Sequence, residues 1–294
     1  MAGPAVFEFL RGLATPALDS IMKVITNLGA DTFYMAVIPV IFWCVSKPFG
    51  FSLGMVTAVS SHFNILLKFA FRVPRPYVTY PHLNAPEFLL KTGTGWSFPS
   101  GHAQGTATFW TYVAASVKKR WVTWVAAVVI VLVSFTRVYA TVHYPSDVVV
   151  GAVLGIAAVL VFIWAQERLA RSNPIPSIGG RIGASIAVPG LVFLVSSFDP
   201  NLASESAQTL GFVMGLGIGY TLEEAYIRYD VRAALPVQVL KALLGLGVLM
   251  GLRVGLKAIL PPAPFFSVLR YAVMALWATY VAPLAFKALF PARS

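Results

Sequence analysis

Charged residues and cysteine are both scarce in this 294-residue sequence. Only 11% of the residues are charged and 58% are hydrophobic, whereas a soluble globular domain usually has about a quarter of its residues charged. This composition excludes a soluble fold. The single cysteine, Cys44, cannot form an internal disulfide, and it excludes a cysteine-based metal site.

Apolar runs without charge recur along the whole sequence, each near the roughly 20 residues that a membrane-spanning helix needs. They predict an all-α, polytopic integral membrane helical bundle. We expect nine transmembrane helices, near 30–46, 50–70, 100–118, 121–142, 146–167, 181–198, 206–225, 236–259 and 266–288. The eighth contains Lys241, Arg253 and Lys257, which near helix ends extend toward the head groups.

The sequence divides into four parts. They are an N-terminal amphipathic interfacial segment (1–29), a helical core (30–168), a polar linker (169–180) and a four-helix C-terminal membrane region of unknown role (181–294). The first part mixes charged and apolar residues and so fits a segment lying on the membrane surface. The glycine spacing in 211–219 favours close helix packing over a nucleotide-binding loop, since no strand precedes it.

Most cations fall on one side of the alternating helices. The members of this set are Lys47, Lys118, Lys119, Arg120, Arg168, Arg171, Arg181, Arg228, Arg232, Lys287 and Arg293. The positive-inside rule makes this side cytoplasmic, so the net charge of +11 reports orientation and not a nucleic-acid partner. The opposite loops, which include 71–98 and 143–146, are then extracytoplasmic. Arg72, Arg75 and Lys91 depart from the rule there, which indicates a bound anion.

Three polar clusters lie on that outer side. They are Lys68-Phe-Ala-Phe-Arg72-Val-Pro74-Arg75-Pro76, Phe98-Pro99-Ser100-Gly101-His102 and Thr136-Arg137-Val-Tyr-Ala-Thr-Val-His143-Tyr-Pro145-Ser-Asp147. Their order and spacing resemble the type 2 phosphatidic acid phosphatase (PAP2) superfamily, whose pattern is Lys-x6-Arg-Pro, Pro-Ser-Gly-His and Ser-Arg-x5-His-x3-Asp. Thr136 stands where the family usually has Ser, which keeps a hydroxyl. The resemblance covers 68–147 directly and 30–168 as a helix arrangement.

The residue types in these clusters suit phosphoryl transfer. A transferring phosphoryl group spreads negative charge over its oxygens, and fixed positive groups stabilise that charge. Lys68, Arg75 and Arg137 supply three such groups, and each arginine fork fits two phosphate oxygens. Ser100 and Gly101 stand where an apolar helix begins, so we expect their backbone N–H groups to bind phosphate too.

Two histidines have separate expected roles. His143 is the expected nucleophile, because Asp147 at the start of the next helix can reach its Nδ1–H and leave Nε2 free. His102 is the expected general acid, which protonates the leaving oxygen. The matching residues of the family play these roles, and the expected intermediate is a phosphohistidine. We expect no metal and no cofactor, since the acidic residues near the four histidines are too few for a di-metal site.

Several other residues have both a functional and a structural interpretation. Arg72 can contact the substrate or membrane phosphates, and Tyr77 and Trp96 can line a substrate mouth or an aromatic belt. For the rest a structural role is favoured or equally open. His62 and Asn64 suit hydrogen bonds between helices, Thr136 can bond its own helix, and Glu223 and Glu224 suit a surface ion pair near Arg228.

The sequence therefore predicts an integral membrane phosphatase acting on a lipid phosphate or lipid diphosphate, with its active site on the extracytoplasmic face. Membrane lipids and this substrate are the expected partners. Short loops favour a bacterial cytoplasmic membrane, where undecaprenyl diphosphate is the first choice of substrate by resemblance, ahead of phosphatidate and related lipids. A lipid phosphotransferase with the same site, and a lipid transporter built on the PAP2 scaffold, stay open as alternatives.

Overall fold

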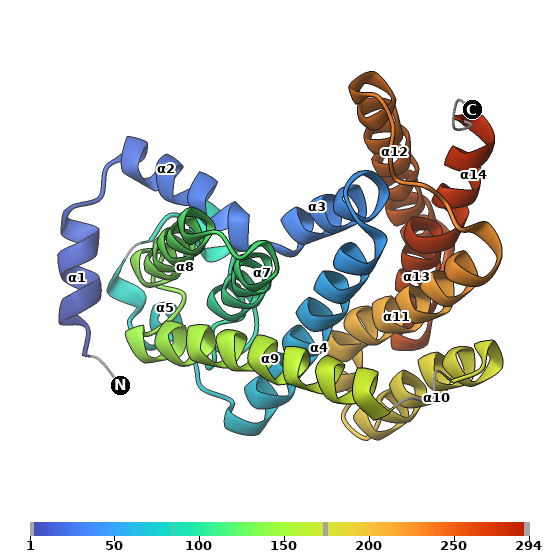
Figure 1. Ribbon diagram of the computed structural model, residues 1–294. Helices are drawn as coiled ribbons and strands as arrows, with labels where there is room; N and C mark the ends of the chain where they lie inside the picture. The colour runs from blue at the N-terminus through green and yellow to red at the C-terminus, as the bar shows by residue number, and fades with distance from the viewer. Residues whose placement is uncertain (1–2, 84, 173–175, 291–294) are drawn as a thin grey trace. The chain divides into compact units, whose positions relative to one another are not determined.

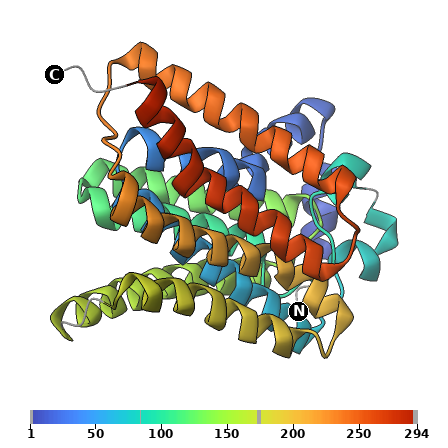
Figure 2. The ribbon, with the colours of Figure 1, turned by 90° about the vertical axis from the view of Figure 1, so that its right-hand side faces the viewer.

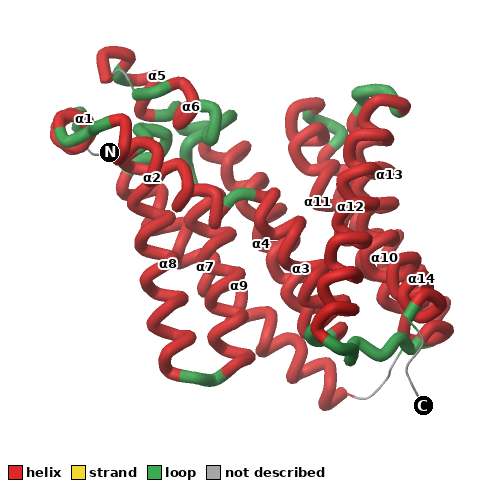
Figure 3. The backbone as a smooth tube through the Cα atoms, turned by 90° about the horizontal axis from the view of Figure 1, so that it is seen from above, coloured by secondary structure: helices red, strands yellow, loops and turns green. Residues whose placement is uncertain are grey.

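The computed structural model describes residues 3–83, 85–172 and 176–290, and every regular element in that part of the chain is a helix (Figure 3). The helices are α1 (Ala5–Gly12), α2 (Pro16–Thr26), η1 (Asn27–Gly29), α3 (Asp31–Cys44), α4 (Lys47–Phe71), α5 (Pro76–Thr79), η2 (Pro81–Leu83), α6 (Glu87–Leu90), α7 (Gly101–Val117), α8 (Arg120–Tyr139), α9 (Pro145–Ser172), α10 (Ile178–Ser196), α11 (Pro200–Leu222), η3 (Glu223–Ile227), α12 (Leu235–Ile259), α13 (Pro264–Leu276), η4 (Trp277–Val281) and α14 (Ala282–Leu289). The all-α prediction is confirmed.

The nine expected spans each correspond to a helix or a run of helices, but the count of nine is not confirmed. Among the described residues, six helices are long and apolar enough to cross a membrane, and a seventh span is possible if the bent pair Pro16–Gly29 and Asp31–Cys44 counts as one. The other two expected spans fall on α7, which has 17 residues, and on α11, which begins with Asn201, Glu205 and Gln208 among its polar residues.

The chain forms two compact units. The first comprises Met1–Tyr34 and Phe63–Arg171, and the second comprises Met35–His62 and Ser172–Ser294. Helix α4 passes from the second unit into the first between His62 and Phe63. All three sequence clusters lie in the first unit. The four-part division expected from the sequence stays a prediction, and residues 173–175 of the expected linker lie outside the described residues.

In the first unit, α7 lies beside α8, and α2 packs along α8 (Figure 1). A short turn at Lys118 and Lys119 joins α7 to α8 at one end of these helices, and α5 and α6 lie at the opposite end (Figure 3). The residues between α4 and α7 therefore lie at the same end of the first unit as the first turn of α7. This arrangement brings the three sequence clusters to one end of the unit.

The N-terminal segment forms α1, α2 and η1, and it carries apolar side chains on both its buried and its exposed faces. Phe7 and Leu10 are buried in a cluster with Tyr139 and Tyr144, whereas Phe9, Leu13, Ile21 and Val24 are exposed. Exposed apolar side chains of this kind suit a membrane surface. The interfacial position of residues 1–29 remains a prediction.

Two glycines of α9 let it approach α7 closely. A Cβ atom at Gly151 would lie 2.6 Å from the carbonyl oxygen of Ser100, and one at Gly155 would lie 2.4 Å from that of Gln104. Both distances are shorter than any real Cβ contact, so only glycine fits. The approach fixes the start of α7, where Ser100 lies, against the start of α9.

The second unit uses the same device. Cβ atoms at Gly211 and Gly215 of α11 would lie 2.2 Å and 2.1 Å from the carbonyl oxygens of Val268 and Ala272 in α13. The expected close helix packing at 211–219 is confirmed. Helices α13, η4 and α14 follow one another as a single rod at the red end of the colour scale (Figure 2).

Two charged residues of the second unit are buried, contrary to expectation. Glu223 is 0% exposed, and its Oε1 accepts hydrogen bonds from Lys47 Nζ at 2.7 Å and from the Tyr229 N–H at 2.7 Å. Its partner is therefore Lys47, so the expected surface pair is wrong for Glu223, whereas Glu224 makes a surface ion pair with Arg181 at 2.5 Å. Lys241 is buried instead of reaching the head groups, because it donates to Tyr229 Oη and to the carbonyl oxygen of Val231.

Candidate active site

Five segments of the first unit contribute to a buried polar cluster. Lys68 comes from the last turn of α4, and Arg75 caps the start of α5. Arg137 comes from the last turn of α8, His143 lies between α8 and α9, and Asp147 lies in the first turn of α9. Arg75, Arg137, His143 and Asp147 are at most 3% exposed. The structure thus brings residues of the first and third sequence clusters into direct contact, and Ser100 of the second cluster contacts Asp147 through its backbone N–H.

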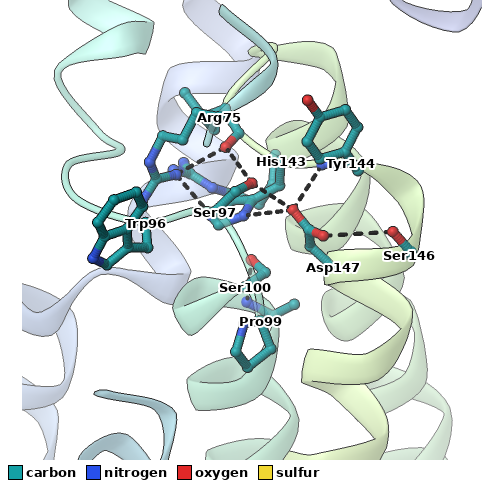
Figure 4. Close-up of polar contacts among 12 residues, drawn as sticks. Arg75, Trp96, Ser97, Pro99, Ser100, His143, Tyr144, Ser146 and Asp147 are labelled. Atoms are coloured by element: carbon teal, nitrogen blue, oxygen red, sulfur yellow. Dashed lines mark hydrogen bonds and ion pairs between the residues drawn. The ribbon is translucent and has the colours of Figure 1, made fainter. Parts of the chain in front are cut away.

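His143 contacts one of the expected phosphate-binding cations through its ring. Arg75 Nη1 lies 3.1 Å from His143 Nε2 (Figure 4). Because a guanidinium only donates, Nε2 is the acceptor here, and the proton of the neutral ring is on Nδ1. This is the tautomer that leaves Nε2 with the lone pair a nucleophile requires.

Asp147 is close to the other ring nitrogen. Its Oδ2 lies 3.4 Å from His143 Nδ1, accepts the N–H of Tyr144 at 2.9 Å and accepts the Ser97 hydroxyl at 2.5 Å (Figure 4). The Nδ1 atom makes no hydrogen bond within the described residues. The carboxylate is therefore fixed by Ser97 and Tyr144 beside the ring, at a distance longer than the hydrogen bond expected from the sequence.

Backbone carbonyl oxygens from one loop accept hydrogen bonds from all three cations. The loop is Thr92–Trp96, called here the 92–96 loop. Lys68 Nζ donates to Trp96 at 2.7 Å. Arg75 donates to Gly95 at 2.9 Å and to Thr94, and Arg137 Nη2 donates to Thr92 at 2.8 Å. The carbonyls occupy donors that a phosphate would need.

Arg137 has two further contacts. Its Nη1 donates to Thr26 Oγ1 in α2 at 2.6 Å and to Thr92 Oγ1 at 2.9 Å, whereas its Nε has no partner in the described part of the chain. Thr26, Thr92 and Ser97 were missed by the sequence analysis. Thr26 and Thr92 stand outside the three clusters, and Ser97 directly precedes the second, so no spacing singled them out.

His102 lies in the first turn of α7, two residues after the N-cap Ser100. Its ring is half-buried and makes no hydrogen bond to another described residue. A Cβ atom at Gly29 of η1 would lie 3.4 Å from its Cδ2 atom. The ring therefore lies between the N-terminal segment and the start of α7, with its nitrogens unused.

The expected anion site at the start of α7 is only partly available. Ser100 is the N-cap as expected, but its own N–H donates to the carbonyl oxygen of Asp147 at 3.0 Å. In this structure the Ser100 N–H is therefore already used, and its binding to phosphate stays a prediction. The reason is the close α7–α9 approach, which presents the Asp147 carbonyl to it. Beside Gly101, Asn64 bonds Gln104 of α7 at 2.8 Å, which confirms the expected helix–helix bond.

The remaining expected residues make other contacts or are exposed. Thr136 donates to the carbonyl oxygen of Val133 at 2.6 Å, the structural interpretation of that hydroxyl. His62 lies 3.4 Å from Thr209 Oγ1 in α11, as a helix–helix contact. Of the possible mouth residues, Arg72 is exposed, Tyr77 donates to Gly93 at 3.4 Å, and Trp96 is half-buried on the 92–96 loop.

The cations also set the charge of His143. Burial lowers the pKa of His143 well below its ordinary value of 6.5, and the positive charges of Arg75, Lys68 and Arg137 lower it further. The ring is therefore neutral at pH 7.

Within the described residues, no group of three His, Cys, Asp or Glu side chains could hold a metal ion.

A buried neutral histidine close to three cations, in an all-helical chain with several apolar spans, is the arrangement expected of a membrane protein that acts on phosphate groups. Residues 49–171 match the PAP2 superfamily, and residues 207–294 match the PAP2 superfamily phosphatase transmembrane extension. The chain belongs to the PAP2 superfamily and is a phosphatase.

Known relatives are membrane lipid phosphatases. Phosphatidylglycerophosphatase B of Bacillus subtilis is 30% identical over 169 residues, which cover 53% of this chain and 79% of the relative. Undecaprenyl-diphosphatase BcrC of the same species is 26% identical over 170 residues, which cover 56% and 84%. The crystal structure of the transmembrane phosphatidylglycerolphosphate phosphatase from Bacillus subtilis has a TM-score of 0.47 and 28% identity, covering 56% of this chain and 84% of that one.

Proposed function

We propose that this protein hydrolyses a lipid phosphate or lipid diphosphate through a phosphohistidine formed on His143. The observation that carries the proposal is the 3.1 Å contact between Arg75 Nη1 and His143 Nε2. It puts a bidentate phosphate-binding group beside a neutral imidazole nitrogen, whose lone pair is released for attack when Arg75 donates to the phosphate instead.

The reaction has two displacements. His143 Nε2 attacks the terminal phosphorus and forms the P–N bond as the P–O bond to the leaving group breaks. The leaving group is a lipid alkoxide from a monophosphate or a lipid monophosphate from a diphosphate, and protonated His102 gives its proton to the departing oxygen. Asp147 stabilises the positive charge that then forms on the His143 ring. In the second step a water molecule gives a proton to His102 and attacks phosphorus, the P–N bond breaks, and inorganic phosphate leaves.

The three cations stabilise the transferring phosphoryl group. Arg75 and Arg137 each offer a fork to two oxygens, and Lys68 adds a point charge. Because these groups neutralise the developing charge, the proposal requires no magnesium. Turnover should survive EDTA, and vanadate should inhibit by binding to the same three cations.

The active site faces the extracytoplasmic side in this proposal. The Lys118-Lys119 turn and the α5–α6 region lie at opposite ends of the first unit (Figure 3), and the positive-inside rule assigns the basic turn to the cytoplasm. A lipid can then present its phosphate to the site while its tails stay in the bilayer. Undecaprenyl diphosphate and phosphatidylglycerophosphate are the first candidate substrates, because relatives are named for them.

The test uses purified protein with phosphatidylglycerophosphate, phosphatidate and undecaprenyl diphosphate, each with and without EDTA. Free phosphate and phosphorylated acceptors are both measured. Wild-type protein and His82→Ala should release phosphate, whereas His143→Ala should not. His82 is the matched control, since its exposed ring contacts Glu8 and Tyr80. Activity in His143→Ala would contradict the proposal, and phosphorylated acceptor without free phosphate would identify a phosphotransferase instead.

A further inference from the structure

We propose that Thr26 is a positioning residue, which holds Arg137 in the orientation that binds the phosphoryl group. The inference rests on the proposed function. Thr26 is the last residue of α2 and is 1% exposed, and its Oγ1 accepts a hydrogen bond from Arg137 Nη1 at 2.6 Å. It lies outside residues 49–171, which match the PAP2 superfamily.

Separate contacts hold α2 in place against α8. Asp19 of α2 accepts from the Tyr139 hydroxyl of α8 at 2.7 Å and pairs with Arg11 of α1 at 2.9 Å. Directly after α2, a Cβ atom at Gly29 would lie 2.8 Å from Val133 Cγ1 of α8. The Thr26 hydroxyl is thus carried by a helix that is anchored on either side of it.

The contacts of Arg137 divide between this helix and the 92–96 loop. Thr92 accepts one hydrogen bond from Arg137 Nη1 with its hydroxyl and one from Arg137 Nη2 with its carbonyl oxygen. A phosphate that displaces Thr92 removes both, and Thr26 then remains as the fixed partner of the guanidinium. The buried Nε N–H, which has no partner within the described residues, is left for a phosphate oxygen. Because Thr26 fixes the Nη1 side of the Arg137 guanidinium, the Nε and Nη2 side is already oriented for phosphate.

The test compares Thr26→Val, which removes the acceptor at constant shape, with Thr26→Ser, which keeps it. Thr221→Val is the matched control, since this buried hydroxyl donates to the carbonyl oxygen of Gly217 in its own helix. We expect Thr26→Val to lower kcat/KM about tenfold and to raise the vanadate inhibition constant by a similar factor. Thr26→Ser and Thr221→Val should stay near wild type.

Vanadate binding is also measured directly by calorimetry, so the inference is tested even without turnover. Thr26→Val with unchanged vanadate affinity would overturn it. Equal losses in Thr26→Val and Thr26→Ser would also overturn it, because they would mean that Thr26 only fills space. Wild-type protein that binds vanadate but hydrolyses no lipid phosphate would instead contradict the proposed function.

A second inference follows from the 92–96 loop. We infer that this loop is a gate, whose backbone carbonyls hold the phosphate-binding cations until substrate displaces them. Four carbonyls, those of Thr92, Thr94, Gly95 and Trp96, accept from Arg137, Arg75 and Lys68. Carbonyl oxygens and phosphate oxygens compete for these N–H donors, so a phosphate that binds to them must displace the carbonyls.

Gly95 permits a test with a predicted sign. Its φ is +65°, a conformation that L side chains rarely adopt, and a Cβ atom there would meet nothing within 4 Å. Gly95→Ala therefore destabilises the observed loop conformation without a clash. If that conformation is the closed gate, the variant populates the open form more, and apparent phosphate affinity rises with the open fraction.

We expect Gly95→Ala to lower the vanadate inhibition constant about fivefold. Gly247→Ala is the control, because that helical glycine also has open space around its Cβ position but an ordinary φ. It should behave as wild type. An unchanged or raised inhibition constant in Gly95→Ala would overturn the gate and identify the observed loop conformation as the one that binds phosphate.

Discussion

The Arg75 guanidinium donates to His143 Nε2 across 3.1 Å, so the group expected to hold phosphate and the atom expected to attack it are already in contact. Arg75 serves His143 in two ways. It fixes the tautomer with Nε2 unprotonated, and its charge helps to lower the pKa of His143 below 6.5.

The pH dependence of turnover should report this charge effect. A nucleophilic histidine must be neutral, so activity falls as the pH drops through its pKa, and the lowered pKa puts the acidic limb of kcat/KM below 6.5. Removing a positive charge raises that pKa. Arg75→Met should therefore move the acidic limb to higher pH, whereas Arg75→Lys, which keeps the charge, should not. A limb that stays in place in both variants would mean that another group controls it.

Loss of His102 should affect monophosphates more than diphosphates. A general acid contributes about 100- to 10,000-fold, and its contribution grows with the basicity of the leaving oxygen. A lipid monophosphate expels an alkoxide, whereas a lipid diphosphate expels a phosphate that needs little protonation. His102→Ala should thus reduce phosphatidate hydrolysis far more than undecaprenyl diphosphate hydrolysis in single turnovers. Equal reductions would assign His102 to binding phosphate or positioning water.

The α11–α13 contact should not tolerate even one methyl group. A Cβ atom at Gly215 would lie 2.1 Å from the Ala272 carbonyl oxygen, and overpacking of this kind costs about 1–3 kcal/mol. Gly215→Ala should lower the thermal unfolding temperature of the protein in detergent. Gly247→Ala should not, because a Cβ atom there would have no other atom within 4 Å. Equal stability of the two variants would contradict the described packing.

Sidedness can be measured by cysteine labelling. In a Cys44→Ser background, a cysteine replacing Glu87 in α6 should react with an impermeant maleimide added to intact cells. A cysteine replacing Lys119 should react only after the membrane is permeabilised. Both side chains are exposed, so access and not burial decides the outcome. The opposite pattern would place the site in the cytoplasm.

The sequence predicted the charged part of the site because charge and spacing are visible there. Lys68, Arg75, Arg137 and His143 stand in two of the three motifs whose order and intervals resemble those of a known family. The partners that hold them were not predictable. A threonine at the end of an amphipathic helix, such as Thr26, has no spacing that links it to Arg137, and main-chain carbonyl groups leave no trace in a sequence.

The helices were predicted more successfully than the number of spans. Apolar runs determine where helices form, but α7 has 17 residues and α11 begins with polar side chains, so length and composition alone do not make either of them a span. Burial of Lys241 and Glu223 was missed for a related reason. Lys47, the partner of Glu223, is distant in the sequence. Tyr229, the partner of Lys241, lies between η3 and α12 in a loop whose course the sequence does not specify.

Chemical trapping of the phosphoenzyme tests the proposed mechanism most directly. Purified protein is mixed rapidly with radiolabelled undecaprenyl diphosphate, quenched in base and digested, and the labelled peptide is sequenced by mass spectrometry. His102→Ala is included because slower attack by water should let the intermediate accumulate. We expect an acid-labile, base-stable label on His143 in the wild type, more of it in His102→Ala, and none in His143→Ala. Phosphate release with no label on His143 in any of these proteins would contradict the phosphohistidine mechanism.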